Sequence, residues 1–483
     1  MMKSRTLLLA CAALFFLTGA VLGRDSIRAP RPPRAPFQVP LPLLPVLAPT
    51  STNATTDFYD ITMQVGQKEI LSGRLTTIWG YNGLYPGPTI MAQRGRTVVV
   101  RQLNNLQESM SVHLHGGHTP PASDGSPNDL IGPGAMKTYI YPNNQAGATL
   151  WYHDHAIDNT GRHAYMGLAG LYVITDPAEA GLGLPSGKSD VALAIQDRLF
   201  NFDGSLNYPL TDTTITSGVF GDTLLVNGAI QPYFQVGRRK YRFRIVNGSG
   251  ARIYTLALST GDPLLQIATD GGLLSSPVSR SSIVVAPGER IEVVIDFANY
   301  ALGTSLILKN QNTTNPSLPD IMRFDVARDE IDQSVVPPTL APARKATSKE
   351  AALVNRTFTL EPNTVMGRPV WTVNGQLYDP MRIDAMPQLN TSEIWTFQNN
   401  SGLPHPMHIH DIHWQILDVN GVPPSAGDAG PKDTFLVPGR VMGVPGTVRV
   451  MGTFTDNVGD YVSHCHNLEH EDHAMMFNFQ VQP

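Results

Sequence analysis

The amino-acid sequence predicts an all-β protein of three β-sandwich domains, on three observations. Its 483 residues are too many for one ordinary domain, and roughly 150 residues per domain would give three. Beyond residue 50, short runs of β-forming residues alternate with Gly, Pro and Asn clusters, which is typical of sandwiches and not of alternating strand and helix units. One such run recurs three times. We therefore expect three related domains and little helix.

The recurring run ends in asparagine in each copy. VVVRQLNN closes at Asn105, YRFRIVN at Asn247 and IWTFQNN at Asn400, at spacings of 142 and 153 residues. This period agrees with the length expected of a domain. Boundaries are expected near residues 50, 180 and 340, the last within the polar stretch ARKATSKE. The expected domains are residues 51–180, 181–340 and 341–483.

The first fifty residues are expected to lie outside these domains. Residues 1–23 resemble a secretory signal, because Lys3 and Arg5 precede the apolar run 7–17 and the small-residue sequence VLG. That run is too short to span a bilayer. Residues 24–50 are so rich in proline that neither helix nor central strand can form, and we expect an extended arm or linker. The mature protein should be a soluble monomer that is secreted, or held in a cell wall or periplasm, and not a membrane protein.

Charge and cysteine content narrow the partners and the redox chemistry. The formal net charge of -5 becomes -7 once the signal is removed, which argues against nucleic acid as a partner. Cys11 lies in the signal, so Cys465 is the single thiol of the mature chain and no intramolecular disulfide is possible. Such a thiol pairs with another chain, is buried inertly, or is used chemically.

Six Asn-x-Ser/Thr sequons admit two interpretations. They are glycosylation sites if the chain passes through a eukaryotic secretory pathway, and a coincidence in a bacterial protein. The six acceptors are Asn53, Asn247, Asn312, Asn355, Asn390 and Asn399.

All fourteen histidines lie in residues 113–163 or 405–473, so the middle repeat holds none. Four pairs have the spacing i, i+2, which on a strand projects both imidazoles from one face toward a shared metal cluster. A shift of 295 residues superimposes HLH on HIH, and a shift of 311 superimposes HDH on HCH, so that Asp154 stands in the place of Cys465. The four pairs are His113 and His115, His153 and His155, His408 and His410, and His464 and His466.

These eight imidazoles predict a cluster at the interface of the first and third domains. Eight are too many for one ion but divide as three, three and two over three metals. The equivalent positions of the middle repeat are Thr255 and Ala257, so the middle domain would be architectural. A lone HxH pair is more often structural or a zinc site, but four pairs in matching repeats disfavour that interpretation.

A second metal site is expected behind the strand of Cys465, because this side chain points away from its two histidine neighbours. His470 follows five residues later and Met475 five after that, while His405 precedes the HIH strand. Two imidazoles, a thiolate and a thioether are the ligands of a blue-copper electron-transfer centre, whereas zinc has no use for the thioether. The remaining histidines are interpreted as hydrogen-bonded or exposed side chains: His118, His163, His413 and His473.

Four segments, HLHGG, WYHDHA, HPMHIH and HCHNLEHEDHAMM, resemble the copper motifs of multicopper oxidases, and the similarity extends from about residue 40 to the end. GRLTTIWGYNGLYPGPTI, GDTLLVNG and KYRFRIVN are most similar to the three-domain bacterial spore-coat laccases, with bilirubin oxidases and plant root ferroxidases as relatives. The resemblance implies three cupredoxin-like Greek-key sandwiches.

The resemblance also implies four coppers per chain, one of type 1, one of type 2 and two of type 3. Type 1 copper would be bound by His405, Cys465 and His470, with Met475 as the axial ligand. Type 2 copper would be bound by His113 and His408. The type 3 coppers would be bound by His115, His153 and His466, and by His155, His410 and His464. Glu471 and Asp124 would be proton donors, although either could be a surface charge.

The implied activity is that of a blue multicopper oxidase. A reducing substrate would deliver single electrons near an exposed His470, and the Cys465 thiolate would pass them to His464 or His466, where dioxygen is reduced to water. Laccase-like oxidation of phenols and aromatic amines is expected from an open pocket at the type 1 site.

Three alternatives stay open. A ferroxidase or another metal-ion oxidase would need acidic side chains beside His470, and the sequence has no methionine-rich insertion typical of cuprous oxidases. A copper-binding protein without turnover is disfavoured by the complete set of ten histidines. A copper nitrite reductase would have no use for a three-metal cluster.

Overall fold

The computed structural model describes residues 35–314, 316–342 and 352–483. The expected signal at 1–23, the start of the arm and the polar stretch 343–350 lie outside the described residues. Within the described ranges strands dominate and the helices are short, which confirms the all-β prediction. The helices are α1 Thr160–Met166, α2 Pro177–Ala180, α3 Asp212–Ser217 and α4 Leu468–Glu471, with 3-10 turns η1 Pro121–Ser123, η2 Gly187–Ser189 and η3 Phe297–Asn299.

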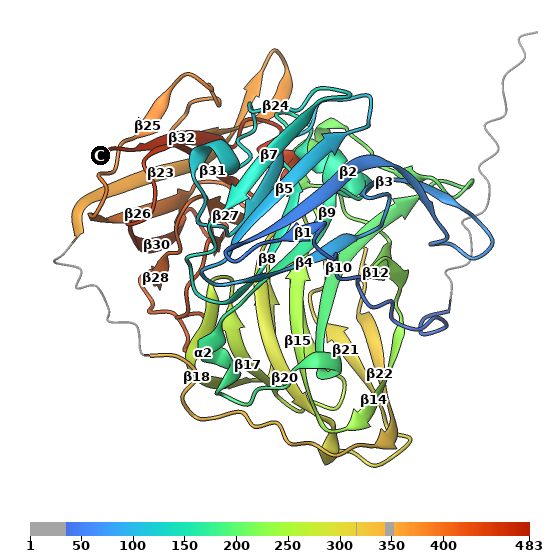
Figure 1. The fold of residues 1–483 in the computed structure, drawn as a ribbon. Helices are drawn as coiled ribbons and strands as arrows, with labels where there is room; N and C mark the ends of the chain where they lie inside the picture. The colour runs from blue at the N-terminus through green and yellow to red at the C-terminus, as the bar shows by residue number, and fades with distance from the viewer. Residues whose placement is uncertain (1–34, 315, 343–351) are drawn as a thin grey trace, which may run out of the picture. The chain divides into compact units, whose positions relative to one another are not determined.

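The first stretch of strands, blue to teal in Figure 1, forms two sheets. Its strands are β1 Ser51–Thr52, β2 Thr56–Lys68, β3 Thr76–Tyr81, β4 Gly87–Gln93, β5 Thr97–Asn104, β6 Val112–His115, β7 Met136–Tyr141, β8 Ala148–Asp154 and β9 Ala169–Thr175. One sheet has the order β1-β2-β5-β7, with β3 beside β2, and the other has the order β4-β9-β8-β6. Tyr59, Val98 and Leu150 belong to the apolar core that both sheets share.

The middle stretch, green to yellow in Figure 1, also forms two sheets. Its strands are β10 Asp190–Phe200, β11 Leu206–Asn207, β12 Thr223–Val226, β13 Ala229–Ile230, β14 Tyr233–Arg238, β15 Lys240–Asn247, β16 Tyr254–Leu258, β17 Leu264–Thr269, β18 Gly272–Arg280, β19 Ile283–Val285, β20 Arg290–Asp296, β21 Ser305–Asn310 and β22 Asp320–Asp329. The orders are β13-β12-β10-β15-β20-β17-β18, with β11 beside β10, and β14-β22-β21-β16-β19. Phe243 and Leu308 lie in its core.

The third stretch, orange to red in Figure 1, repeats the plan with two five-stranded sheets. Its strands are β23 Ala352–Val365, β24 Arg368–Val373, β25 Ile383–Ala385, β26 Ser392–Asn399, β27 His405–Ile409, β28 Gln415–Val419, β29 Thr434–Val437, β30 Gly446–Thr453, β31 Gly459–Cys465 and β32 Met476–Val481. The orders are β24-β23-β26-β30-β28 and β25-β32-β31-β27-β29. Cys465 is part of its core.

The sequence repeat corresponds to one strand in each stretch, and the structure corrects its alignment by one residue. β5, β15 and β26 each pair in parallel with an earlier strand and end at a buried asparagine. The side-chain amide of Asn104, Asn247 or Asn399 donates to two backbone carbonyls and accepts from the amide two residues later. The residues equivalent to Asn247 are therefore Asn104 and Asn399, which the shift of 295 residues superimposes, and not Asn105 and Asn400. The middle-stretch positions equivalent to the HLH pair then become Leu256 and Leu258 instead of Thr255 and Ala257. Division into domains with boundaries near residues 50, 180 and 340 stays a prediction.

The asparagine repeat bears on glycosylation. Asn247 and Asn399 are two of the six sequon acceptors, yet both are buried and their side chains are fully used within the fold. These two positions are therefore unsuited to a glycan in the folded protein. Glycosylation at the other four stays a prediction.

The described part of the arm is extended, as expected, but it is packed against the strands and is not a free linker. The Leu41 amide donates to the Tyr233 carbonyl of β14 at 2.7 Å, and the Leu47 amide donates to the Thr89 carbonyl of β4 at 2.8 Å. Leu41 is buried in the core of the middle stretch, and Leu47 packs on the core of the first. The arm thus joins these two stretches. No helix in the described ranges is long and apolar enough to cross a membrane.

Candidate metal centre

The four histidine pairs meet between the first and third stretches of strands. His113 of β6 faces His153 of β8, and His408 of β27 faces His464 of β31, so both stretches present the same arrangement. The second imidazole of each pair ends its strand or directly follows it. All eight imidazoles are buried. Each stretch fixes two pairs, and the docking of the two stretches forms one eight-imidazole group, which we call the histidine cluster.

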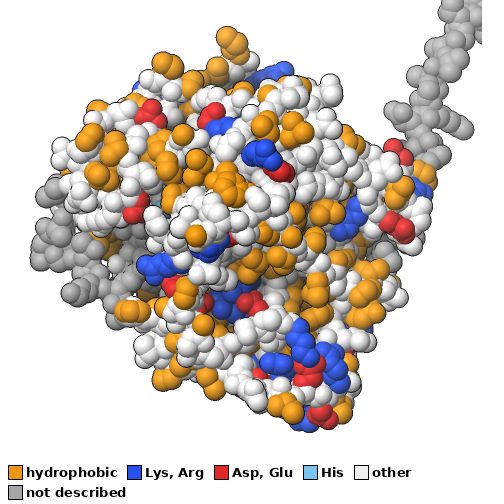
Figure 2. Space-filling model, viewed as in Figure 1, with side chains coloured by type: hydrophobic (Ala, Val, Ile, Leu, Met, Phe, Trp, Pro, Cys, Tyr) orange, Lys and Arg blue, Asp and Glu red, His pale blue; other side chains and the backbone are white. Residues whose placement is uncertain are grey.

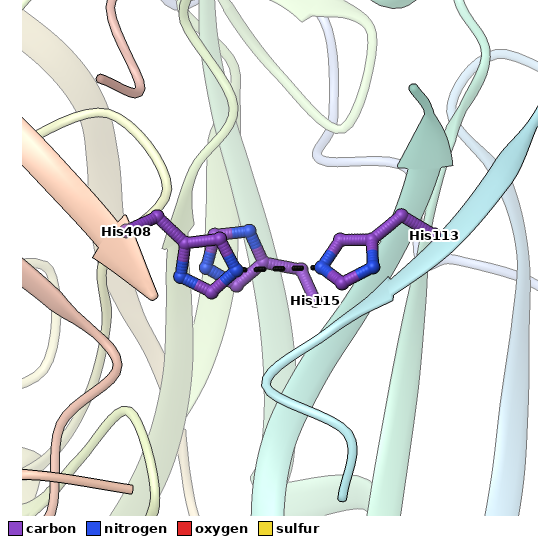
Figure 3. A group of neighbouring side chains, drawn as sticks. All are labelled: His113, His115 and His408. Carbon is purple, nitrogen blue, oxygen red and sulfur yellow. Dashed lines mark hydrogen bonds between the residues drawn. The ribbon is translucent and has the colours of Figure 1, made fainter. Parts of the chain in front are cut away.

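Within the histidine cluster the ring nitrogens converge in three groups, in each of which they lie within 4.8 Å of one another. One group centres on His113 and His408, whose Nε2 atoms are 3.3 Å apart, with His115 beside them (Figure 3). The other two groups each draw imidazoles from both stretches. They are His115, His153 and His466, and His155, His410 and His464. These are the groupings that the family resemblance implies.

Hydrogen bonds on the far side of the rings decide which nitrogen faces the cluster. Four imidazoles donate from Nδ1 to backbone carbonyls at 2.6 to 3.1 Å, so their Nε2 atoms carry the free lone pairs. His115 differs, because its Nε2 lies 3.1 Å from Asp433 Oδ1 and its Nδ1 has no hydrogen-bond partner among the described residues. The four donations run from His113 to Asp124, from His153 to Asp154, from His408 to Asp433 and from His464 to Cys465.

Seven of the eight cluster imidazoles have a pKa below the usual value, which favours the neutral form that binds metal ions. They are His115, His153, His155, His408, His410, His464 and His466. Burial lowers the pKa of His155 and His464 to about 3 and that of His408 to about 4. Within the described ranges, Nε2 of His153 and both nitrogens of His466 find no hydrogen-bond partner although they are buried. Unpaired buried polar atoms are costly, and a bound cation is a partner that satisfies neutral imidazole nitrogens.

Two carboxylates lie against the group of His155, His410 and His464. His410 Nδ1 donates to Asp124 Oδ2 at 2.7 Å, and His464 Nδ1 lies 2.9 Å from Glu471 Oε2. Both acids are buried, which excludes the alternative that they are surface charges. Burial also raises the pKa of Glu471.

The predicted second site lies on the other face of β31. Cys465 Sγ is 3.6 Å from His405 Nδ1 and 3.7 Å from His470 Nδ1, and these two nitrogens are 3.1 Å apart. After α4 the chain turns back, so that the Cys465 amide donates to the Met475 carbonyl at 3.0 Å, and both side chains are buried in one core. We call these four residues the Cys465 site. Burial raises the pKa of the Cys465 thiol, so a thiolate here needs a cation beside it.

Comparison with known proteins identifies the family. Models described as Multicopper oxidase match residues 62–179 and 347–483. A laccase of Bacillus subtilis is 36% identical, with 90% of this chain and 96% of that protein covered, and a bilirubin oxidase of Albifimbria verrucaria is 35% identical, with 96% and 85% covered. A crystal structure of a laccase from Pediococcus acidilactici superposes with a TM-score of 0.84 at 30% identity, covering 93% and 95% of the two chains. The chain belongs to the multicopper oxidase family.

Membership of this family makes copper the cofactor, and the donor sets fit it. The three pairs of sheets agree with the cupredoxin-like sandwiches of the multicopper oxidases. The histidine groups fit type 2 and type 3 copper sites, and the Cys465 site has the imidazole, thiolate and thioether set of a type 1 copper. The orphaned ring nitrogens and the high pKa of the buried thiol each agree with a bound cation.

One expectation about the multicopper oxidase fold was wrong, because His470 is fully buried and not exposed. Its Nε2 donates to the carbonyl of Thr216 at 3.0 Å, and the ring of Trp371 packs on it at a centroid distance of 4.3 Å. Thr216 belongs to α3 of the middle stretch, so this stretch covers the Cys465 site. An open pocket at this site stays a prediction; a cavity of about 400 Å³ lies elsewhere in the described residues and is lined by residues such as Leu274 and Pro431.

Sequence reasoning missed several residues of this multicopper oxidase. Asp433, Trp371 and the backbone of Thr216 contact His115 or His470, but they carry no local sequence pattern that marks them. His118 and His413 had a signal, since the shift of 295 residues relates them too, and His118 Nε2 lies 3.0 Å from His413 Nδ1. His118 also pairs with Asp456. The interpretation of these two histidines, and of His163 and His473, as hydrogen-bonded side chains is confirmed.

Proposed function

We propose that this multicopper oxidase is laccase-like, taking single electrons from small phenolic or aromatic amine donors and reducing dioxygen to water. One observation carries the proposal: every histidine expected of the copper motifs is present, buried and grouped with its expected partners. A protein that merely stored copper would not require a neutral three-group cluster beside a thiolate site.

Four coppers per chain are proposed, held as follows. Type 1 copper would be held by His405, Cys465, His470 and Met475, and type 2 copper by His113 and His408. The type 3 coppers would be held by His115, His153 and His466, and by His155, His410 and His464. Copper, when bound, supplies the one-electron redox steps that imidazole and carboxylate groups cannot perform. Cys465 is joined by single peptide bonds to His464 and His466, so the backbone connects the two sites directly.

Asp124 and Glu471 are proposed to deliver the protons that water formation requires. Asp124 accepts a hydrogen bond from His410 Nδ1, and Glu471 Oε2 lies 2.9 Å from His464 Nδ1 of the same three-imidazole group. A buried carboxyl with a raised pKa, such as Glu471, can hold a proton nearer neutral pH than an exposed one. Both acids would therefore stand beside the group at which dioxygen reduction is proposed to consume protons.

We propose that donor electrons reach His470 through the residues of α3 that bury it, at or near the Thr216 carbonyl. A ferroxidase would instead need free acidic groups there. The two acids that flank His470 are Glu469 and Glu471, which are both buried. Glu469 accepts from the Tyr208 hydroxyl and the Val219 amide, and Glu471 faces the cluster. These contacts favour an organic donor over ferrous ion.

We also propose that the protein is exported and acts as a monomer on small molecules. The sequence of residues 1–23 supports export. Charged side chains of both signs are interspersed with apolar ones on the face drawn in Figure 2, and no broad basic area is seen on that face, which supports the proposal that nucleic acid is not the partner.

Copper content and oxygen uptake test this function together. We expect about four coppers per chain and oxygen consumption that a phenol drives faster than ferrous ion does. Zinc in place of copper, or purified protein that takes up no copper, would contradict the oxidase proposal. Faster uptake with ferrous ion would leave the oxidase class standing and overturn the choice of donor.

A further inference from the structure

The middle stretch supplies no metal ligand, yet it reaches the histidine cluster. Gly288, in the turn before β20, has φ +83, and a Cβ placed there would lie 2.8 Å from a ring carbon of His466 and 3.1 Å from one of His115. Only glycine combines this backbone conformation with such close contact. The turn is therefore built to press the middle stretch against two cluster imidazoles.

Arg290 follows two residues later and is completely buried. Its Nη1 and Nη2 atoms donate to the two carboxylate oxygens of Asp433 at 2.7 and 2.5 Å, and its Nε donates to the Thr149 carbonyl at 3.0 Å. A guanidinium forms such a two-point contact in one fixed geometry. Arg290 thus joins all three stretches, since it belongs to the middle stretch, Thr149 to the first and Asp433 to the third.

Asp433, which Arg290 binds, also contacts two cluster imidazoles. Its Oδ1 lies 3.1 Å from His115 Nε2, and its backbone carbonyl accepts from His408 Nδ1 at 2.9 Å. A carboxylate paired with a guanidinium only accepts hydrogen bonds. Thr434 Oγ1 also lies 3.1 Å from His115 Nε2, but this hydroxyl donates to Asp433 Oδ1 at 2.9 Å, so His115 donates from Nε2. Its lone pair then lies on Nδ1, the buried atom that finds no hydrogen-bond partner among the described residues.

We infer that Arg290 is a positioning residue for the cluster: by holding Asp433, it fixes His115 with the proton on Nε2 and the lone pair on Nδ1. This inference rests on the proposed copper cluster and gives the middle stretch a part in copper binding beyond architecture. The ligand itself is His115, and Arg290 acts on it only through Asp433.

Two further contacts support a fixed Arg290. On its far side the Arg290 amide donates to Asp270 Oδ1 at 2.7 Å, and Asp270 is itself paired with the buried Lys432 at 2.9 Å. Gly116, the residue after His115, leaves room for the guanidinium, because a Cβ there would lie 2.4 Å from Arg290 Nη2. The glycine that follows the HLH motif is thus explained by the arginine of another stretch.

The first test compares two buried arginines that differ in what they touch. Arg290→Lys keeps the charge but loses the two-point contact to Asp433. Arg252→Lys is the matched control, because Arg252 is equally buried in the middle stretch and pairs with buried Asp197 at 2.8 Å. The measurements are Tm, copper per chain, blue absorption of the type 1 site, and electron paramagnetic resonance of the cluster copper.

We expect Arg290→Lys to hold cluster copper about 10- to 100-fold more weakly while its blue band persists. Arg252→Lys should lose Tm but keep its copper. Full cluster copper in Arg290→Lys, or equal copper loss in both variants, overturns the inference. Wild-type protein without copper would overturn the proposed function, and the inference with it.

Asp433→Asn provides a second test if Arg290→Lys does not fold. Arg290 would attract the amide oxygen, which leaves the amide NH2 facing His115 Nε2 and shifts the imidazole proton to Nδ1. Selective loss of copper from the group of His115, with the blue band retained, is the expected result. Retention of that copper at wild-type affinity would show that the contact to Asp433 does not set the orientation of His115.

Discussion

The Nε2 atoms of His155 and His464 lie 3.1 Å apart, although 309 residues separate the two side chains. One belongs to the first stretch of strands and the other to the third, so their site exists only when the two stretches dock. Because both imidazoles are proposed to bind the same copper, we expect the loss of either one to disable that site.

A double-mutant cycle checks this dependence. His155→Ala and His464→Ala should each lose most of the copper of this group, and the double variant should lose no more than either single variant, because residues that act as a unit are not additive. Copper per chain is the measurement. Copper losses that simply add would show that the two imidazoles serve separate sites.

Cys465→Ser should abolish the blue band and donor oxidation while cluster copper remains. The hydroxyl that replaces the soft thiolate is a poor ligand for this type of copper. Ser463→Ala, on the same strand and equally buried, loses a hydrogen bond to the His408 carbonyl and costs about 1 kcal/mol. This control should keep the blue band. Unchanged donor oxidation in Cys465→Ser would contradict the proposed electron route.

Glu471→Gln should lower kcat by about 100-fold or more, because the amide keeps the shape of the side chain but cannot supply a proton. Reduction of the blue band by the donor without oxygen should be unaffected, since that step needs no proton from Glu471. Glu469→Gln is the control on the same helix, as Glu469 faces Tyr208 and Val219 and not the cluster. An equal fall in kcat in both variants would argue against a proton role specific to Glu471.

The histidine pairs and the separate Cys465 site could be predicted from sequence because their geometry is local, whereas the assignment of the imidazoles to three groups is implied by the family resemblance. An i, i+2 pair on a strand fixes two imidazoles on one face, and Cys465 between His464 and His466 has to point to the other. The repeat then matched the outer stretches to each other. These features, like the all-β fold, can be inferred without knowledge of tertiary contacts.

The burial of His470 under α3 and the contact of Asp433 with His115 could not be predicted in the same way. His470 is capped by a backbone carbonyl, that of Thr216, and any residue type supplies a carbonyl. Arg290 and Asp433 are 143 residues apart and meet only through docking of the stretches. His118 and His413 are a different case, because the repeat shift related them and their pairing could have been inferred.

Weaker packing of α3 over His470 should change which donors the protein accepts. Ile215 of α3 is buried, and its carbonyl accepts from Trp371 Nε1 at 3.1 Å, next to His470. Ile215→Ala should cost about 2 to 4 kcal/mol of stability and lower KM more for a bulky phenol than for a small one. Ile321→Ala, in the core of the same stretch, should destabilise comparably without changing the ratio of the two KM values. A constant ratio in Ile215→Ala would mean that α3 does not limit donor access.

Lys68 links the first and middle stretches and should make stability depend on pH. At the end of β2, its Nζ donates to the Tyr85 carbonyl at 2.5 Å and lies 3.5 Å from the Asn227 carbonyl. Burial lowers the pKa of Lys68 from 10.5 to about 8. Between these values the unfolded chain binds more protons than the folded one, so the free energy of unfolding rises with pH.

Lys68→Met should remove up to about 3 kcal/mol of that rise. Urea unfolding of both proteins across this pH range measures the difference, and parallel curves would show that Lys68 is not the group responsible.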